Sequence, residues 1–98
     1  MNINKKVNGT SLEISLSGRL DTTTAPELEA ELKRSLDGVD PLTLDFGELS
    51  YISSAGLRVL LYAQRQMDAQ GDMKVTQVNE SVMEIFEVTG FNDILTIE

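Results

Sequence analysis

The chain has no cysteine, no histidine and no tryptophan among its 98 residues. Without cysteine it can form neither a disulfide nor a thiolate metal site. Without histidine it lacks the imidazole base of Ser-His-Asp and Cys-His catalytic sites, and it also lacks the commonest zinc ligand. We therefore expect a protein that is not an enzyme and that uses no metal or cofactor.

Basic residues are also scarce, with 8 Lys and Arg against 16 Asp and Glu and a formal net charge of −8. A surface of this sign repels the phosphates of nucleic acid and of anionic membranes, and it suits a protein partner with a basic surface. No apolar run approaches the ~20 residues that span a bilayer, and the N-terminal segment lacks a signal-peptide core. We expect a cytoplasmic protein with neither nucleic acid nor membrane as a partner.

The spacing of apolar residues predicts one α/β domain over residues 1–98, with a mixed sheet of four to five strands packed against helices. Alternation predicts strands at residues 2–7, 11–17, 42–46, 73–78 and 94–97. Apolar residues three and four apart predict helices at residues 24–36, 54–67 and 79–88. Every connection is short, so no linker is expected.

Local signals predict where some of these elements begin and end. Asn8 and Gly9 are a typical hairpin pair between the first two strands. Thr24 and Glu27 have the spacing of a capping box at the start of the first helix. Gly47–Ser50 interrupts the alternation of the central strand and predicts a turn there.

The most informative segment is the one in which paired serines stand between the central strand and the second helix. Either Ser53 or Ser54 can cap that helix, because a serine oxygen accepts a free backbone N–H. The start of a helix also favours anions, and Gly56 in the first turn is expected to leave the amides approachable. A phosphate on Ser54 would be well placed, although most serines at such junctions serve only as caps.

Two motifs resemble those of the bacterial STAS-domain proteins that act as anti-sigma factor antagonists. The first is GRLD, from Gly18 to Asp21, and the second is LSYISSAGL, from Leu49 to Leu57. The resemblance covers nearly the whole chain and includes the Gly-Phe pair after the last helix. It implies a mixed sheet with helices on one side.

The resemblance also implies a mechanism of partner switching. The unphosphorylated antagonist binds an anti-sigma factor that is a serine kinase, and a sigma factor is released. The kinase phosphorylates the antagonist, which then dissociates, and a PP2C-type phosphatase restores it. The phosphoacceptor lies two positions before the motif glycine and is Ser54 here. The family often has aspartate immediately before that serine, whereas this chain has Ser53, which is an alternative acceptor.

The partner-binding surface is expected to combine the two motif loops with the outer face of the second helix. Its predicted residues are Asp21, Thr22, Tyr51, Ser53, Ser54, Gly56, Arg58 and Tyr62. Arg58 and Arg65 lie on roughly one side of that helix, with Val59 and Tyr62 flanking them. The same pattern is also typical of an ordinary solvated helix face.

Three alternatives account for part of the sequence. A STAS scaffold or adaptor subunit of a lipid-transport ATPase or sensory complex would have the same fold without phosphoswitching, and Ser54 would be structural. A carrier protein with a phosphopantetheine arm on Ser54 conflicts with the predicted strands and with the missing Asp-Ser-Leu signature. A serine hydrolase conflicts with the absence of histidine and of a Gly-x-Ser-x-Gly elbow.

Overall fold

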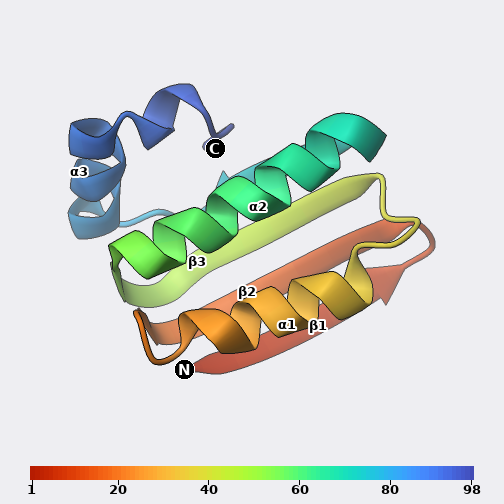
Figure 1. The fold of residues 1–98 in the computed structure, drawn as a ribbon, viewed down its shortest axis with the longest axis horizontal. Helices are drawn as coiled ribbons and strands as arrows, with labels where there is room; N and C mark the ends of the chain where they lie inside the picture. The colour runs from red at the N-terminus through yellow and green to blue at the C-terminus, as the bar shows by residue number, and fades with distance from the viewer.

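A computed structural model describes all 98 residues as a four-stranded mixed sheet with three helices (Figure 1). The strands lie in the order β1-β2-β3-β4 and comprise β1 (Asn2–Asn8), β2 (Ser11–Leu20), β3 (Pro41–Ile52) and β4 (Asp72–Thr76). The helices are α1 (Ala25–Ser35), α2 (Ser54–Gln70) and α3 (Glu80–Thr89), and a 3₁₀ turn follows as η1 (Phe91–Asp93). The predicted α/β fold is confirmed.

The order of the strands explains why the helices share one face of the sheet. β1 and β2 form an antiparallel hairpin, whereas β2, β3 and β4 are successively parallel. Each parallel step needs a crossover, which is right-handed in almost all proteins, and two steps in the same direction place both crossover helices on one side. Figure 1 shows α1 and α2 side by side over the sheet, with α3 toward one end. The opposite face has no helix.

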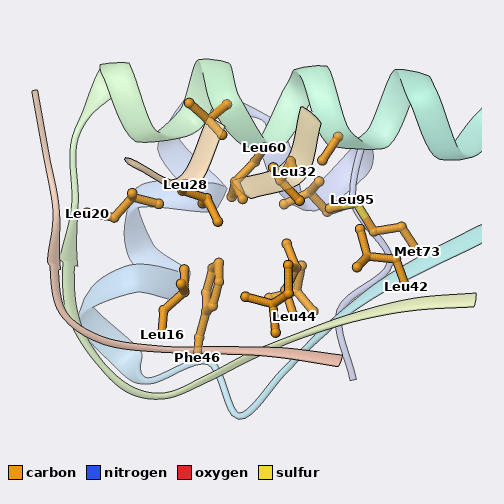
Figure 2. Packing of buried hydrophobic residues seen from close by; sticks show 14 of the residues in the cluster. Leu16, Leu20, Leu28, Leu32, Leu42, Leu44, Phe46, Leu60, Met73 and Leu95 are labelled. Atoms are coloured by element: carbon orange, nitrogen blue, oxygen red, sulfur yellow. The ribbon is translucent and has the colours of Figure 1, made fainter. Parts of the chain in front are cut away.

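The core is one cluster of 24 buried hydrophobic residues between the sheet and the helices. Leu16 of β2 and Phe46 of β3 rise from the strands below Leu60 of α2, as Figure 2 shows. Leu28 of α1 enters the same space, and each of these four side chains is at most 1% exposed. Fully burying such a side chain is worth about 1.5–3 kcal/mol. This cluster therefore holds the helices on the sheet.

The predicted turn at Gly47–Ser50 is wrong, because β3 continues through it as a bulged strand. Relative to β2, β3 has one extra residue before Glu48 and another after Leu49. Each bulge separates successive inward positions by three residues instead of two. Phe46, Leu49 and Ile52 consequently all point into the core. The alternation that indicates a strand is broken although the strand persists.

Two side chains hold the second bulge in place. The Ser50 hydroxyl donates to the carbonyl oxygen of Gly18 in β2 at 2.9 Å. The Asn79 side-chain amide donates to the carbonyl oxygen of Leu49 at 2.7 Å, and its oxygen accepts the Val82 N–H at 2.9 Å. Asn79 thereby caps α3 and ties its start to β3. Hydrogen bonds at this bulge therefore connect β3 to both β2 and α3.

Two smaller predictions are also wrong. The Thr24 hydroxyl donates to the Arg19 carbonyl oxygen at 2.7 Å and makes no capping bond to α1, so there is no capping box with Glu27. The predicted strand at residues 94–97 is reduced to a single bridge from Ile97 to β4, because η1 turns the chain before it. The sheet therefore has four strands and not five.

The predicted N-terminal hairpin is confirmed with a small shift. Asn8 still pairs with Ser11, so the turn lies at Gly9 and Thr10, one residue later than the predicted pair. Gly9 has a φ of 63°, which lies in the left-handed region that glycine adopts without strain.

Gly56 lies where the first turn of α2 rests on the ends of β2 and β3. A Cβ at this position would lie 2.8 Å from side-chain atoms of Leu20 and Ile52, and 3.0 Å from the Leu20 carbonyl oxygen. The residue is buried against the ends of these strands, and its predicted contact with a partner stays a prediction. Its role is to let the helix approach the sheet closely.

We predict that Gly56→Ala destabilises the protein. Alanine is the better helix former by about 1 kcal/mol, but overpacking of this kind costs about 1–3 kcal/mol, because the new methyl presses on Leu20 and Ile52. Urea unfolding followed by circular dichroism measures the free energy of unfolding. Ala30→Gly, on the exposed face of α1, is the control for helix propensity alone and should lose about 1 kcal/mol. A stabilised Gly56→Ala protein would contradict the close-approach explanation.

Candidate functional site

The two sequence motifs meet at one edge of the sheet. β2 runs on to Leu20, beyond the predicted strand, and pairs in parallel with β3, so Arg19 lies beside Tyr51 and Leu20 beside Ile52. α1 follows β2 and α2 follows β3 after short loops. Because parallel strands end at the same edge, both helices begin there, and the motif loops form one continuous site.

The two serines at the start of α2 have different environments. Ser53 is the N-cap and is half-buried: its hydroxyl oxygen accepts the Gly56 N–H at 3.4 Å, and its backbone N–H donates to the Leu20 carbonyl oxygen at 2.9 Å. Ser54 is the first helical residue and is exposed. The Ser53 hydroxyl therefore serves the fold, whereas the Ser54 hydroxyl is accessible from solvent.

The electrostatic surroundings of Ser54 favour negative charge. The first turn of a helix has N–H groups without intrahelical acceptors and a partial positive charge. No acidic residue lies in the first turn of α2. Arg58 follows Ser54 by four residues, which places the two on the same face of the helix, and both are exposed. A negatively charged group on Ser54 would therefore meet amides and a cation.

Asp21 organises the loop between β2 and α1. Its carboxylate accepts the backbone N–H groups of Thr23 at 3.0 Å and Thr24 at 3.1 Å. The Thr24 N–H lowers the pKa of the Asp21 carboxyl below its ordinary value. The Thr23 N–H, the Thr24 hydroxyl and the Arg19 guanidinium at 3.7 Å act in the same direction, and partial burial opposes them. Asp21 is thus an ionised structural acceptor, and its contact with a partner stays a prediction.

Arg19 is a member of the site that sequence reasoning did not single out. Its guanidinium lies 4.3 Å from the centre of the Tyr51 ring, a cation–π geometry, and also pairs with Asp21. The side chain links the two motif loops across the strand ends. Arg19 could have been identified from the pairing of β2 with β3, which brings it beside Tyr51. That pairing follows from the sequence only if the predicted helix between the two strands is taken to connect parallel neighbours.

A groove of about 470 Å³ lies between α1 and the N-terminal half of α2. Three predicted partner residues line it, namely Thr22, Arg58 and Tyr62. Val59, predicted to flank the exposed stripe, is only 6% exposed and lies in this groove. The opposite wall belongs to α1 and includes Lys33, whose amino group lies 5.9 Å from the Tyr62 ring centre. No sequence signal pairs α1 with α2, so this wall was missed.

A mixed sheet with helices on one face is the fold that the resemblance to STAS domains implies. The family model described as "Mlab, STAS domain" matches residues 3–96. The chain belongs to the STAS-domain family.

Relatives and solved structures agree with this assignment. BtrV of Bordetella bronchiseptica, provisionally named an anti-sigma factor antagonist, is 40% identical over 84 residues, which cover 84% of this chain and 72% of BtrV. The anti-sigma-B factor antagonist of Bacillus subtilis is 26% identical over 98 residues, covering 99% of this chain and 90% of that protein. Unphosphorylated SpoIIAA, an anti-sigma factor antagonist, superposes with a TM-score of 0.78 at 19% identity, covering 99% of this chain and 87% of SpoIIAA. The phosphorylated form of SpoIIAA gives a TM-score of 0.76 at 19% identity, covering 99% of this chain and 91% of that form. The predicted one-sided arrangement of helices is confirmed.

None of the helices combines the length and the apolar character needed to cross a membrane. No group of three or more His, Cys, Asp or Glu side chains is placed to hold a metal ion. The candidate site consists of the motif loops, Ser54, the outer face of α2 and the groove beside it.

We predict that Asp21→Asn changes the pH dependence of stability. The pKa of Asp21 is lowered in the folded state, so its ionised form contributes stability above the ordinary pKa of about 3.9, and this contribution is lost as the pH falls through the folded pKa. The difference in unfolding free energy between wild type and Asp21→Asn should be constant above about pH 5 and shrink below about pH 4. Urea unfolding at several pH values measures it.

The control for this experiment is Thr23→Ala, which keeps the backbone N–H that Asp21 accepts. Its unfolding free energy should follow that of wild type in parallel over the whole pH range. A difference between wild type and Asp21→Asn that is as large at about pH 3 as at about pH 7 would contradict the assignment.

Proposed function

We propose that this STAS domain is an anti-sigma factor antagonist that works by partner switching at Ser54. The unphosphorylated chain binds an anti-sigma factor that is a serine kinase, and this binding releases a sigma factor. The kinase then phosphorylates Ser54, the complex dissociates, and a PP2C-type phosphatase removes the phosphate. The observation that carries the proposal is the exposed hydroxyl of Ser54 at the point where both family motifs meet. The names of BtrV and of the Bacillus subtilis relative support antagonism of an anti-sigma factor.

The different exposure of the two serines supports Ser54, and not Ser53, as the residue that is phosphorylated. The Ser53 hydroxyl is the N-cap of α2 and is half-buried, so its modification would remove a capping interaction worth about 0.5–2 kcal/mol. Modification of the exposed Ser54 removes no hydrogen bond of the fold. Because position 53 is not acidic, the free amides at the start of α2 are the main local feature that favours a phosphate on Ser54.

A phosphate on Ser54 can break a complex without unfolding the domain. It adds about −1.5 to −2 charges and strong acceptor oxygens, which the helix start tolerates in the free protein. In a complex the same group would have to lose its water, and an unpaired buried charge costs several kcal/mol. Since ~1.4 kcal/mol corresponds to tenfold in affinity, this local change is sufficient to release a partner.

A second candidate function is favoured by two observations. The matching family model carries the description "Mlab, STAS domain", and Ser53 stands where the family often has aspartate. Both fit a STAS scaffold or adaptor subunit of a lipid-transport ATPase or sensory complex, in which Ser54 is only structural. Incubation with a serine-kinase anti-sigma factor and ATP separates the two functions, because only the antagonist should gain a phosphate on Ser54 by mass spectrometry.

We predict that Ser54→Asp weakens binding to the anti-sigma factor at least about tenfold, because it places a carboxylate in the contact. The free energy of unfolding should stay within about 1 kcal/mol of wild type, since the site is exposed. Calorimetric titration against each purified serine-kinase anti-sigma factor of the source organism measures the affinity. The matched control is Ser81→Asp, which adds the same charge to an exposed serine in the first turn of α3. Equal affinity for wild type and Ser54→Asp would count against the switch.

We further predict that Ser54→Ala binds the kinase but is not labelled by it with radioactive ATP. Ser53→Ala should still be labelled, although loss of the cap should lower its free energy of unfolding by about 0.5–2 kcal/mol. Labelling that persists in Ser54→Ala and disappears in Ser53→Ala would move the acceptor to Ser53.

A further inference from the structure

The basic side chains of the protein are mostly neutralised within the chain, with one local exception. Five of the eight take part in ion pairs, namely Lys5, Arg19, Lys33, Arg34 and Lys74. The other three are Lys6 on β1, and Arg58 and Arg65 on α2. Two of the three unpaired cations therefore lie on a single helix, the one that begins at Ser54.

The spacing along α2 gathers these cations into a stripe. Ser54, Arg58, Leu61 and Arg65 follow one another at intervals of three or four residues, so they form one line along the helix. Ser54 and both arginines are exposed, and Leu61 is partly buried between them. We name these four residues the α2 stripe.

The α2 stripe contains no acidic residue to offset its arginines. The single acid of α2 is Asp68, near the end of the helix, which accepts a hydrogen bond from the Gln64 side chain at 2.8 Å. The stripe thus has a formal charge of +2 on a protein whose net charge is −8. Arginine with adjoining apolar surface is also the composition found at the energetic centre of protein interfaces.

We propose that the α2 stripe docks on an acidic surface of the anti-sigma factor, with Arg58 and Arg65 as the residues that determine specificity. This proposal rests on the proposed function and identifies the chemistry of the partner at that site. The net negative charge of the chain repels an acidic patch, whereas the two arginines of the α2 stripe attract it, so charge favours an orientation of the complex in which this stripe faces the partner. The net charge of the chain, which suggests a basic partner, does not describe this contact.

The same charge pattern explains how phosphorylation of Ser54 acts on the contact. A phosphate adds about −1.5 to −2 charges at the head of the stripe, and one helical turn separates it from Arg58. The formal charge of the stripe thereby falls from +2 to about zero. The modification removes the attraction for an acidic patch and adds repulsion at the same place.

The experiment compares two double variants that lose the same charge. Arg58→Gln with Arg65→Gln neutralises the α2 stripe, and Lys6→Gln with Lys74→Gln removes two cations from the helix-free face of the sheet. Affinity for each purified serine-kinase anti-sigma factor of the source organism is measured by calorimetric titration at ~0.1 M and at ~1 M NaCl, where the Debye length is ~10 Å and ~3 Å. Circular dichroism checks that both variants fold.

At low salt the arginine variant should bind at least about tenfold more weakly than wild type, and the lysine variant within about threefold of it. High salt should weaken wild type and leave the arginine variant nearly unchanged, because screening removes what the mutation has already removed. An arginine variant that binds as tightly as wild type, or more tightly, would overturn the acidic-partner proposal while leaving the switch intact if Ser54→Asp still dissociates. Equal binding of wild type and Ser54→Asp overturns the switch itself, and a chain that binds none of these anti-sigma factors overturns both.

Discussion

The parallel pairing of β2 with β3 is the constraint on which the rest of the site depends. It brings the ends of the two strands, and therefore the starts of α1 and α2, to the same edge of the sheet. Two bulges in β3 keep Leu49 and Ile52 in the core while the chain turns toward the helix. Gly56 then allows the first turn of α2 to rest directly on Leu20 and Ile52, which places Ser54 beside the ends of both strands.

The two neighbouring serines of this segment have different environments. The Ser53 hydroxyl is held at the N-cap, and its backbone bonds to β2, so α2 begins at a defined residue. The Ser54 hydroxyl is exposed at the first residue of this helix. A modification there changes the charge that a partner meets and leaves the cap, the bulges and the core as they were.

The parts of the fold that depend on local periodicity could be predicted from the sequence, whereas those that depend on contacts between distant segments could not. The helices and the alternating strand at residues 11–17 follow directly from apolar spacing. The bulges at Gly47–Ser50 imitate a turn, because a bulge breaks the two-residue period just as a turn does. The close packing at Gly56 could not be predicted for a related reason, because it depends on Leu20, which is far away in sequence. The α1 wall of the groove was missed because only the crossover brings α1 beside α2.

The net charge of the chain and the charges on one part of its surface lead to different expectations about a partner. A net charge of −8 suggests a basic partner when the charges of the chain are taken together. Beyond ~10 Å, however, salt screens most of this field, and contacts are governed by the charges that face each other. Ion pairs within the chain neutralise most of its cations and leave Arg58 and Arg65 free on the helix that Ser54 begins. The proposed switch would need only one phosphate on Ser54, since the charge of one dianion would cancel that of the two arginines.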